Sequence, residues 1–153
     1  MLKNTSFNYP VNAVESIEAR PLSVEECPTI QMPLGVWGFE RIKRYEIHSR
    51  EGQEPFQWFR MPGEESVGFL VVSPFVVMPE YRPDLDPDDV EYLGLRGPEE
   101  ALFYNIVTLR GAGRATINLK GPVVAHRKTH IAKQVLLTNA SDYSVQHPLP
   151  GVV

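Results

Sequence analysis

The sequence has few of the features on which secreted proteins, membrane proteins and many enzymes depend. It contains a single cysteine, Cys27, which excludes an internal disulfide, a cysteine zinc cluster and an intramolecular redox pair. Its longest apolar stretch, residues 69–78, is interrupted by Ser73 and Pro74 and falls far short of the roughly 20 residues that a membrane-spanning helix needs. Residues 1–20 alternate polar and apolar groups and contain no secretory signal core. We therefore expect a cytoplasmic protein without a membrane partner.

Motifs of the common catalytic classes are also missing. No serine lies in a G-x-S-x-G elbow, and no phosphate loop of the form G-x-x-x-x-G-K-[ST] is present. The segment 111–113 (Gly-Ala-Gly) lacks the third glycine of a dinucleotide fingerprint and predicts a hairpin turn. His126 and His130 could share a zinc ion on a helix, but their surroundings indicate strand and turn, so we expect surface imidazoles. No enzymatic activity, metal or cofactor is expected.

What the chain does have is the pattern of an all-β protein. Its 153 residues, 42% of them hydrophobic, suit one domain over 1–153, and its 11 glycines and 14 prolines separate short apolar segments. Alternation at period two predicts strands at 44–48 and 56–58, with Tyr45, Ile47, Phe56 and Trp58 pointing inward. Further strands are predicted at 67–77, ended or bulged by Pro74, and at 102–109, 115–119, 123–125 and 134–138. The expected fold is a small, mostly antiparallel, β-barrel-like single domain.

One short acidic helix is predicted to interrupt the sheet. Asp86 is an N-cap candidate, Pro87 follows at the first helical position, and Asp88 and Asp89 complement the helix dipole. Gly94 supplies a stop after barely two turns. Because so short a helix is marginal by itself, we expect it to pack on the sheet and to leave its aspartates exposed at the rim.

Charge is distributed unevenly along the chain. The net charge is −4, but residues 80–100 hold eight acids and two bases, whereas residues 101–153 hold six bases and one acid. The acidic block could steer a basic partner, or it could simply be a solvated helix face. The bases do not form a dense cluster with aromatic residues, which argues against nucleic acid as the first choice of ligand.

Nine short segments, in order, resemble the flagellar assembly factor FliW family over about residues 30–149, whereas residues 1–29 diverge from it. They are Leu34-Gly-Val-Trp-Gly-Phe-Glu40, Pro55-Phe-Gln-Trp58, Val71-Val-Ser-Pro-Phe75 with Pro79-Glu-Tyr81, Leu93-Gly-Leu95, Ile106-Val-Thr108, Thr116-Ile-Asn-Leu119 with Gly121-Pro-Val-Val124, Lys133-Gln-Val-Leu-Leu137, Tyr143, and His147-Pro-Leu149.

The resemblance implies a partner switch in flagellum biogenesis. A protein of this family is expected to bind newly made flagellin in the cytoplasm, as a chaperone does. When free, it is expected to bind and antagonise the translational regulator CsrA, which relieves repression of flagellin translation. It implies a barrel-like protein without catalysis, cofactor or direct nucleic-acid contact, and we expect a monomer when no partner is bound.

The acidic insertion and two nearby aromatic residues are our candidates for partner contacts. We expect the carboxylates to engage CsrA and the aromatic rings to add contact area, with Tyr81 exposed and Phe75 alternatively a core residue. The candidate set is Phe75, Tyr81, Asp84, Asp86, Asp88 and Asp89.

Two other functional classes stay open at this point. A small β-barrel could bind single-stranded nucleic acid, which would require exposed aromatic side chains; the candidates are Tyr45, Phe56, Trp58 and Phe59. An enzyme of unrecognised type would require titratable groups that converge in a pocket.

Overall fold

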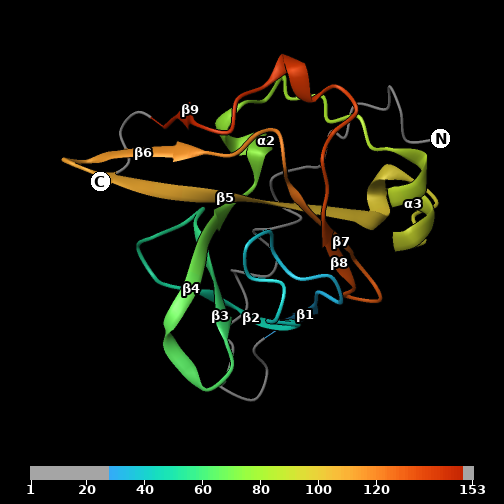
Figure 1. Cartoon of the computed structure of the whole chain (residues 1–153). Helices are drawn as coiled ribbons and strands as arrows, with labels where there is room; N and C mark the ends of the chain where they lie inside the picture. The colour runs from blue at the N-terminus through green and yellow to red at the C-terminus, as the bar shows by residue number, and fades with distance from the viewer. Residues whose placement is uncertain (1–27, 150–153) are drawn as a thin grey trace.

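The computed structural model describes residues 28–149, with the backbone alone for residues 64–67. Expectations for Cys27 and for the N-terminal segment up to residue 27 therefore lie outside the described residues. Within residues 28–149, nine strands and four short helical segments follow one another (Figure 1). They are β1 (Thr29–Gln31), β2 (Arg44–Ser49), β3 (Gln57–Met61), β4 (Glu64–Val72), α2 (Pro74–Val77), α3 (Pro87–Leu93), η2 (Pro98–Glu100), β5 (Ala101–Gly111), β6 (Arg114–Ile117), β7 (Val123–His126), β8 (Ala132–Gln134), η3 (Ala140–Asp142) and β9 (His147–Pro148).

The long strand β5 is the centre of the sheet. The strand order is β1-β2-β3-β4-β5-β6-β9, and all of these neighbours pair antiparallel. The first part of β5, residues 101–104, pairs with β7, which in turn pairs with β8. Its later part, residues 107–111, pairs with β6. Two branches of the sheet, one through β6 and one through β7, therefore share β5. Figure 1 shows β5 crossing the width of the molecule.

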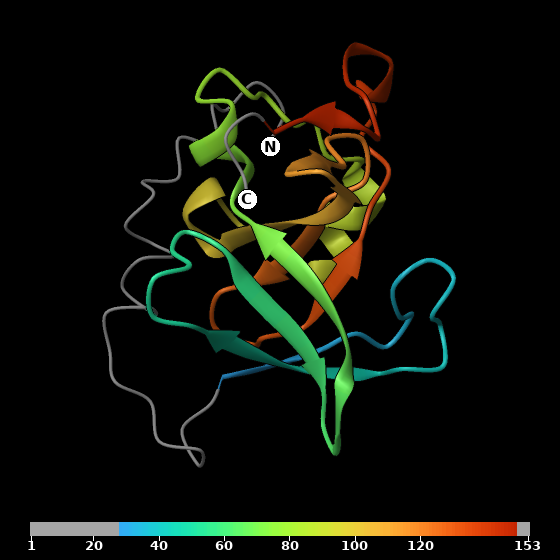
Figure 2. The ribbon, with the colours of Figure 1, turned by 90° about the vertical axis from the view of Figure 1, so that its left-hand side faces the viewer.

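The sheet curls round on itself, but its edges do not pair along their length. A single parallel bridge joins Gln31, at the end of β1, to Ile131, just before β8, and the Gln31 N–H donates to the His130 carbonyl at 2.8 Å. Because one bridge is not a ladder, the structure is barrel-like and open. The all-β, mostly antiparallel class predicted from the sequence is confirmed, and Figure 2 shows the twisted strands from the side.

Two apolar clusters cover the opposite faces of β5. Leu102 and Tyr104 belong to the cluster inside the curl, with Tyr45, Ile47 and Phe59. Phe103 and Val107 belong to the second cluster, which is completed by side chains from α2, α3 and the loops around them. Residues that alternate along a strand point to opposite faces, so β5 reads as a continuous apolar run because both of its faces are buried.

The predicted inward set was wrong for Trp58. Tyr45 and Ile47 are 0% and 2% exposed, as expected, and Phe56 is half-buried and packs against the second apolar cluster, but Trp58 is half-buried on the other face of β3 from Phe59. The register explains the difference: Phe59 lies directly opposite Ile47, and residues opposite one another share a face of the sheet. Phe59 is therefore fully buried, and Trp58 lies on the other face with His48.

The predicted boundaries are confirmed where local signals set them. The backbone leaves β4 before Pro74, which begins α2, so the segment 74–77 is helical and not the end of a strand. The turn at 111–113 joins β5 to β6 with positive φ at all three residues, as in a tight hairpin. The predicted strand 134–138 is displaced, since β8 covers Ala132–Gln134.

Candidate partner-binding surface

The acidic helix α3 forms as predicted. The Asp86 side chain caps it by accepting a hydrogen bond from the Asp88 N–H at 2.8 Å. Gly94 ends it in the left-handed region, at φ 69°, where a residue without Cβ is favoured. Leu93 is 4% exposed, and Val90 packs against the same apolar cluster. Tertiary packing thus holds a helix of seven residues whose outer side faces solvent.

The chain that leads into α3 is fastened to the loop that precedes β9. The Asp84 N–H donates to Asn139 Oδ1 at 3.0 Å, and the Asn139 amide donates to the Arg82 carbonyl at 2.8 Å. The Thr138 N–H donates to the Asp84 carbonyl at 2.9 Å. Asp84 is half-buried, and it makes these contacts through its main-chain N–H and carbonyl groups.

Tyr81 is buried, so the expectation that it is exposed was wrong. Its side chain is 0% exposed, and its hydroxyl donates to the Leu119 carbonyl at 2.6 Å. Its ring lies edge-on to Tyr143, with centroids 4.8 Å apart. Burial raises the pKa of Tyr81 well above its ordinary value. Flanking charges at positions 80 and 82 suggested exposure, but a strong acceptor inside the fold holds the side chain in.

Phe75 is a core residue as well. It is 7% exposed, and its ring contacts those of Tyr81 and Phe103 at centroid distances of 5.7 and 5.5 Å. The alternative that the sequence left open, a packing role, describes its environment. Neither aromatic candidate presents its ring to a partner in this structure.

Asp89 does not lie at the exposed rim, contrary to expectation. It is 7% exposed and forms an ion pair with Lys133 of β8. The Lys133 ammonium also lies 5.4 Å from the centroid of the Tyr92 ring, within the range of a cation–π contact. This carboxylate therefore ties α3 to the sheet, and a partner could not use it without breaking that pair.

Of the six candidate residues, Asp88 is the one with an exposed side chain. Glu91 and Tyr92, three and four residues further on, are exposed too, Tyr92 at 43%. Residues spaced by three and four positions share a side of a helix. We call Asp88, Glu91 and Tyr92 the α3 outer face. Tyr92 was missed as a candidate, and its spacing from Asp88 was the signal that could have found it.

The two histidines lie in different environments. His126 is buried in β7, where its Nδ1 accepts from the Lys128 N–H at 3.0 Å and its Nε2 lies 3.6 Å from Glu100 Oε1. His130 is exposed, at φ 64°, in the tight turn after β7. The prediction of two surface imidazoles was wrong for His126. Within residues 28–149, no group of three or more His, Cys, Asp or Glu side chains could hold a metal ion.

The aromatic platform required for stacking nucleic-acid bases is not formed by the four predicted residues. Tyr45 and Phe59 are fully buried, with their ring centroids 5.8 Å apart. Trp58 donates from its indole N–H to Gln53 at 3.1 Å and carries the Arg50 guanidinium over its ring. Two of the four rings are thus inaccessible to a ligand.

Comparison with known proteins assigns the family. The model of the family described as FliW protein matches residues 13–149. The chain belongs to the FliW family. It is 32% identical to the flagellar assembly factor FliW of Clostridioides difficile (strain 630) over 121 residues. This alignment covers 78% of this chain and 92% of that protein. It is 35% identical over 117 residues to the flagellar assembly factor FliW of Thermotoga neapolitana, over 75% of this chain and 78% of the relative.

A solved FliW structure has the same fold. The crystal structure of the flagellar assembly factor FliW superposes with a TM-score of 0.72 at 28% identity, over 86% of this chain and 93% of that chain. The resemblance noted in the sequence is thereby confirmed, and the FliW match begins at residue 13, earlier than the region near residue 30 where the resemblance begins. Among residues 28–149, no helix has the length and apolar character to cross a bilayer.

Proposed function

We propose that this member of the FliW family is a non-enzymatic flagellar assembly factor that binds flagellin in the cytoplasm and, when free, binds and antagonises CsrA. Binding of CsrA relieves repression of flagellin translation, so synthesis follows export. Family membership supports the general role. The observation that carries a binding role for this chain is the α3 outer face, where two carboxylates and a tyrosine stand exposed on a helix that is fixed at both ends.

The α3 outer face suits a basic protein partner. Asp88 and Glu91 have no ion-pair partner among the described residues, so both charges are available. Charges at the rim of an interface mainly accelerate association and set its salt dependence. Tyr92 adds an exposed apolar ring with a polar hydroxyl. Tyrosine is one of the residue types enriched among those that contribute most of the binding energy at interfaces. CsrA binds RNA, so we expect its surface to carry positive charge that complements Asp88 and Glu91.

The other members of the candidate set then act by holding this face in place. Asp86 caps α3, Asp89 joins it to β8, and Asp84 fastens the segment before it. Phe75 and Tyr81 fill the apolar cluster beneath. Substitution of Asp86, Asp89, Phe75 or Tyr81 would alter partner binding through the position of α3, whereas Asp84 acts through its main chain. Only Asp88 would touch the partner directly.

A switch of this kind needs the two partners to exclude one another. A coupling free energy of about 1–3 kcal/mol, or about 5- to 150-fold in affinity, already gives a useful response to flagellin supply. Overlap of the two binding surfaces would give stronger exclusion, because one partner would then block the other sterically.

Titration calorimetry in competition tests the proposal. The purified full chain is titrated with flagellin and with CsrA from the same host, each alone and then in the presence of the other. Binding of both, with displacement of one by the other, supports the switch. Binding of neither, with both partners shown to be folded, overturns it. Light scattering of the free chain tests the expectation of a monomer.

A further inference from the structure

A half-exposed tryptophan, Trp37, is held against the β7–β8 pair. It lies in the loop between β1 and β2, which Figure 2 shows in blue and cyan standing out from the sheet. Its main-chain N–H donates to Gln134 Oε1 at 2.9 Å, and the Gln134 amide donates to the Gly121 carbonyl at 3.0 Å. Gln134 is 5% exposed, so a buried side chain fixes the tryptophan in place, yet Trp37 itself is 48% exposed.

The missing side chain of Gly121 makes room for the indole ring. A Cβ atom placed on Gly121 would lie 2.7 Å from Trp37 Cζ3, so a larger residue there would displace the ring. The Gly121 N–H donates to Asn118 Oδ1 at 2.9 Å, which holds the glycine in its turn. Because the main chain and the ring of Trp37 are both held before a partner arrives, little conformational entropy is lost when the ring binds one.

Leu136 extends the apolar surface next to Trp37. The β7–β8 pairing continues past the last residue of β8, because the Val135 N–H donates to the Pro122 carbonyl at 3.0 Å. This register places Leu136 opposite Gly121, and residues opposite one another share a face. The Leu136 side chain, which is 58% exposed, therefore lies beside the indole ring on Gly121. We call these two side chains the Trp37–Leu136 surface.

The main chain of Leu136 is open as well. In an antiparallel pair, every second residue directs its N–H and C=O away from the partner strand. Leu136 is at such a position, and its N–H and C=O have no hydrogen-bond partner within residues 28–149. An extended segment of a partner can therefore make main-chain hydrogen bonds here, next to the two apolar side chains.

This surface differs chemically from the α3 outer face. Leu136 and Lys133 are three residues apart in extended chain and so point to opposite faces, and Lys133 pairs with Asp89 of α3. In the β1–β2 loop, the Glu40 carboxylate already accepts the Gly38 N–H at 2.9 Å. The carboxylates of α3 suit a basic partner, whereas the Trp37–Leu136 surface suits a partner that presents uncovered apolar groups.

From these observations we propose that the Trp37–Leu136 surface binds flagellin, one of the two partners in the proposed function on which this inference rests, through an extended apolar segment that flagellin buries only after it polymerises. Before assembly, a subunit of a polymer leaves uncovered the surface that later contacts its neighbours, and such permanent interfaces are more apolar than the rest of a protein surface. The segment places an apolar side chain on the indole ring and pairs its main chain with Leu136. Well-packed tryptophans are among the residues that contribute most of the binding energy at interfaces.

Fluorine NMR of the full chain tests the site directly. The sequence contains two tryptophans, Trp37 and Trp58, so protein labelled with 5-fluorotryptophan gives two resonances, which Trp58→Phe assigns. Unlabelled monomeric flagellin from the same host is then added. The Trp37 resonance should shift or broaden on binding. The Trp58 resonance should stay in place, because that indole lies on β3 and donates to Gln53.

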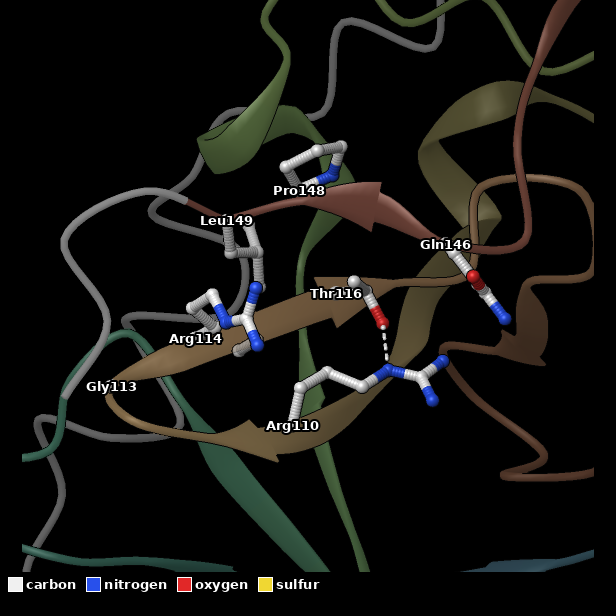
Figure 3. A pocket seen from close by; sticks show the side chains of 8 residues that line it. Arg110, Gly113, Arg114, Thr116, Gln146, Pro148 and Leu149 are labelled. Atoms are coloured by element: carbon white, nitrogen blue, oxygen red, sulfur yellow. Dashed lines mark hydrogen bonds between the residues drawn. The ribbon is translucent and has the colours of Figure 1, made fainter.

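Two exposed leucines supply a matched pair of variants. Leu136→Ser removes one of the two apolar side chains and should weaken flagellin binding about tenfold in titration calorimetry. Leu109→Ser removes a leucine that is 60% exposed, in the β5–β6 hairpin, and should leave the affinity unchanged. Figure 3 shows this hairpin, where the Arg110 Nε–H donates to Thr116 Oγ1 at 3.3 Å. Thermal unfolding checks that both variants fold.

The possible outcomes separate this site from the proposed function. Flagellin that binds the wild-type chain without moving the Trp37 resonance would overturn the site and leave the proposed function standing, as would equal losses in the two leucine variants. Absence of any flagellin binding would overturn both. A Trp37 shift caused by CsrA and not by flagellin would overturn the choice of partner, and so would a shift that depends on the concentration of the free chain, since a second copy would then be the occupant.

Discussion

The hydroxyl of Tyr81 donates a 2.6 Å hydrogen bond to the main-chain carbonyl of Leu119, 38 residues further along the chain. It joins the segment before α3 to the chain that follows β6, inside the apolar cluster on which α2 and α3 pack. Tyr45, in the other cluster, is equally buried, but its hydroxyl has no hydrogen-bond partner among the described residues.

These two tyrosines should therefore respond differently to removal of the hydroxyl. Tyr81→Phe leaves a buried carbonyl without its donor and should lower the free energy of unfolding by about 1–3 kcal/mol. Tyr45→Phe removes an unsatisfied polar atom and should be neutral or stabilising. Urea unfolding followed by fluorescence measures both. Equal effects of the two substitutions would contradict the assigned hydrogen bond.

The buried tyrosines should also make the fold sensitive to alkali. Burial raises the pKa of Tyr45 from 10.0 to about 12 and shifts the pKa values of Tyr81 and Tyr104 upward as well. A raised pKa in the folded state stabilises the fold fully below pH 10 and progressively less as the pH rises through about 12. Phenolate absorbance and circular dichroism, recorded together, should show these tyrosines ionising as the chain unfolds. Their ionisation near pH 10 in a folded chain would contradict the prediction.

The Asp89–Lys133 ion pair should contribute to stability. Lys133→Met leaves a buried carboxylate without its cation and should cost about 1–3 kcal/mol, below the value for a fully buried pair because Lys133 is partly exposed. Asp88→Asn, at an exposed neighbour, serves as the control and should change stability by less than about 0.5 kcal/mol. A double-mutant cycle of Asp89→Asn with Lys133→Met isolates the coupling, and a coupling energy of zero would refute the pair.

The N-cap of α3 offers a local test. Asp86→Ala removes the acceptor for the Asp88 N–H and should destabilise the protein by about 0.5–2 kcal/mol, whereas Asp86→Ser keeps an acceptor and should recover most of that loss. Amide hydrogen exchange should quicken in the first turn of α3 in the alanine variant. Unchanged exchange there would show that packing, and not the cap, holds the helix.

Charge reversal on the α3 outer face tests the proposed contact with CsrA. Asp88→Lys with Glu91→Lys should lower the association rate about tenfold or more at low salt, and the difference should shrink as salt is added. The matched variant Glu51→Lys with Glu54→Lys reverses two exposed carboxylates in the β2–β3 turn and should have a smaller effect. Surface plasmon resonance gives the rates. Identical rates for both double variants would remove the α3 outer face from the interface.

The elements that the sequence by itself determined depend on near neighbours in the chain. The α3 boundaries follow from a carboxylate two residues before the N–H that it caps and from a glycine at φ 69°. The β5–β6 turn follows from two glycines around Ala112, at φ values of 83° and 72°. In such cases the signal and the group on which it acts lie within one turn, so no knowledge of the fold is required.

The environment of the candidate site was decided by tertiary structure. Asp89 looked like its exposed neighbour Asp88, but the lysine that pairs with it is 44 residues away. Tyr81, between two charged residues, looked exposed until the Leu119 carbonyl came within reach of its hydroxyl. Aromatic residues at 56, 58 and 59 allow either face of β3 to be the buried one, and only pairing with β2 chooses Phe59. Whether a side chain is buried depends on which distant residues contact it in the fold. The residues next to it in the chain do not predict those contacts.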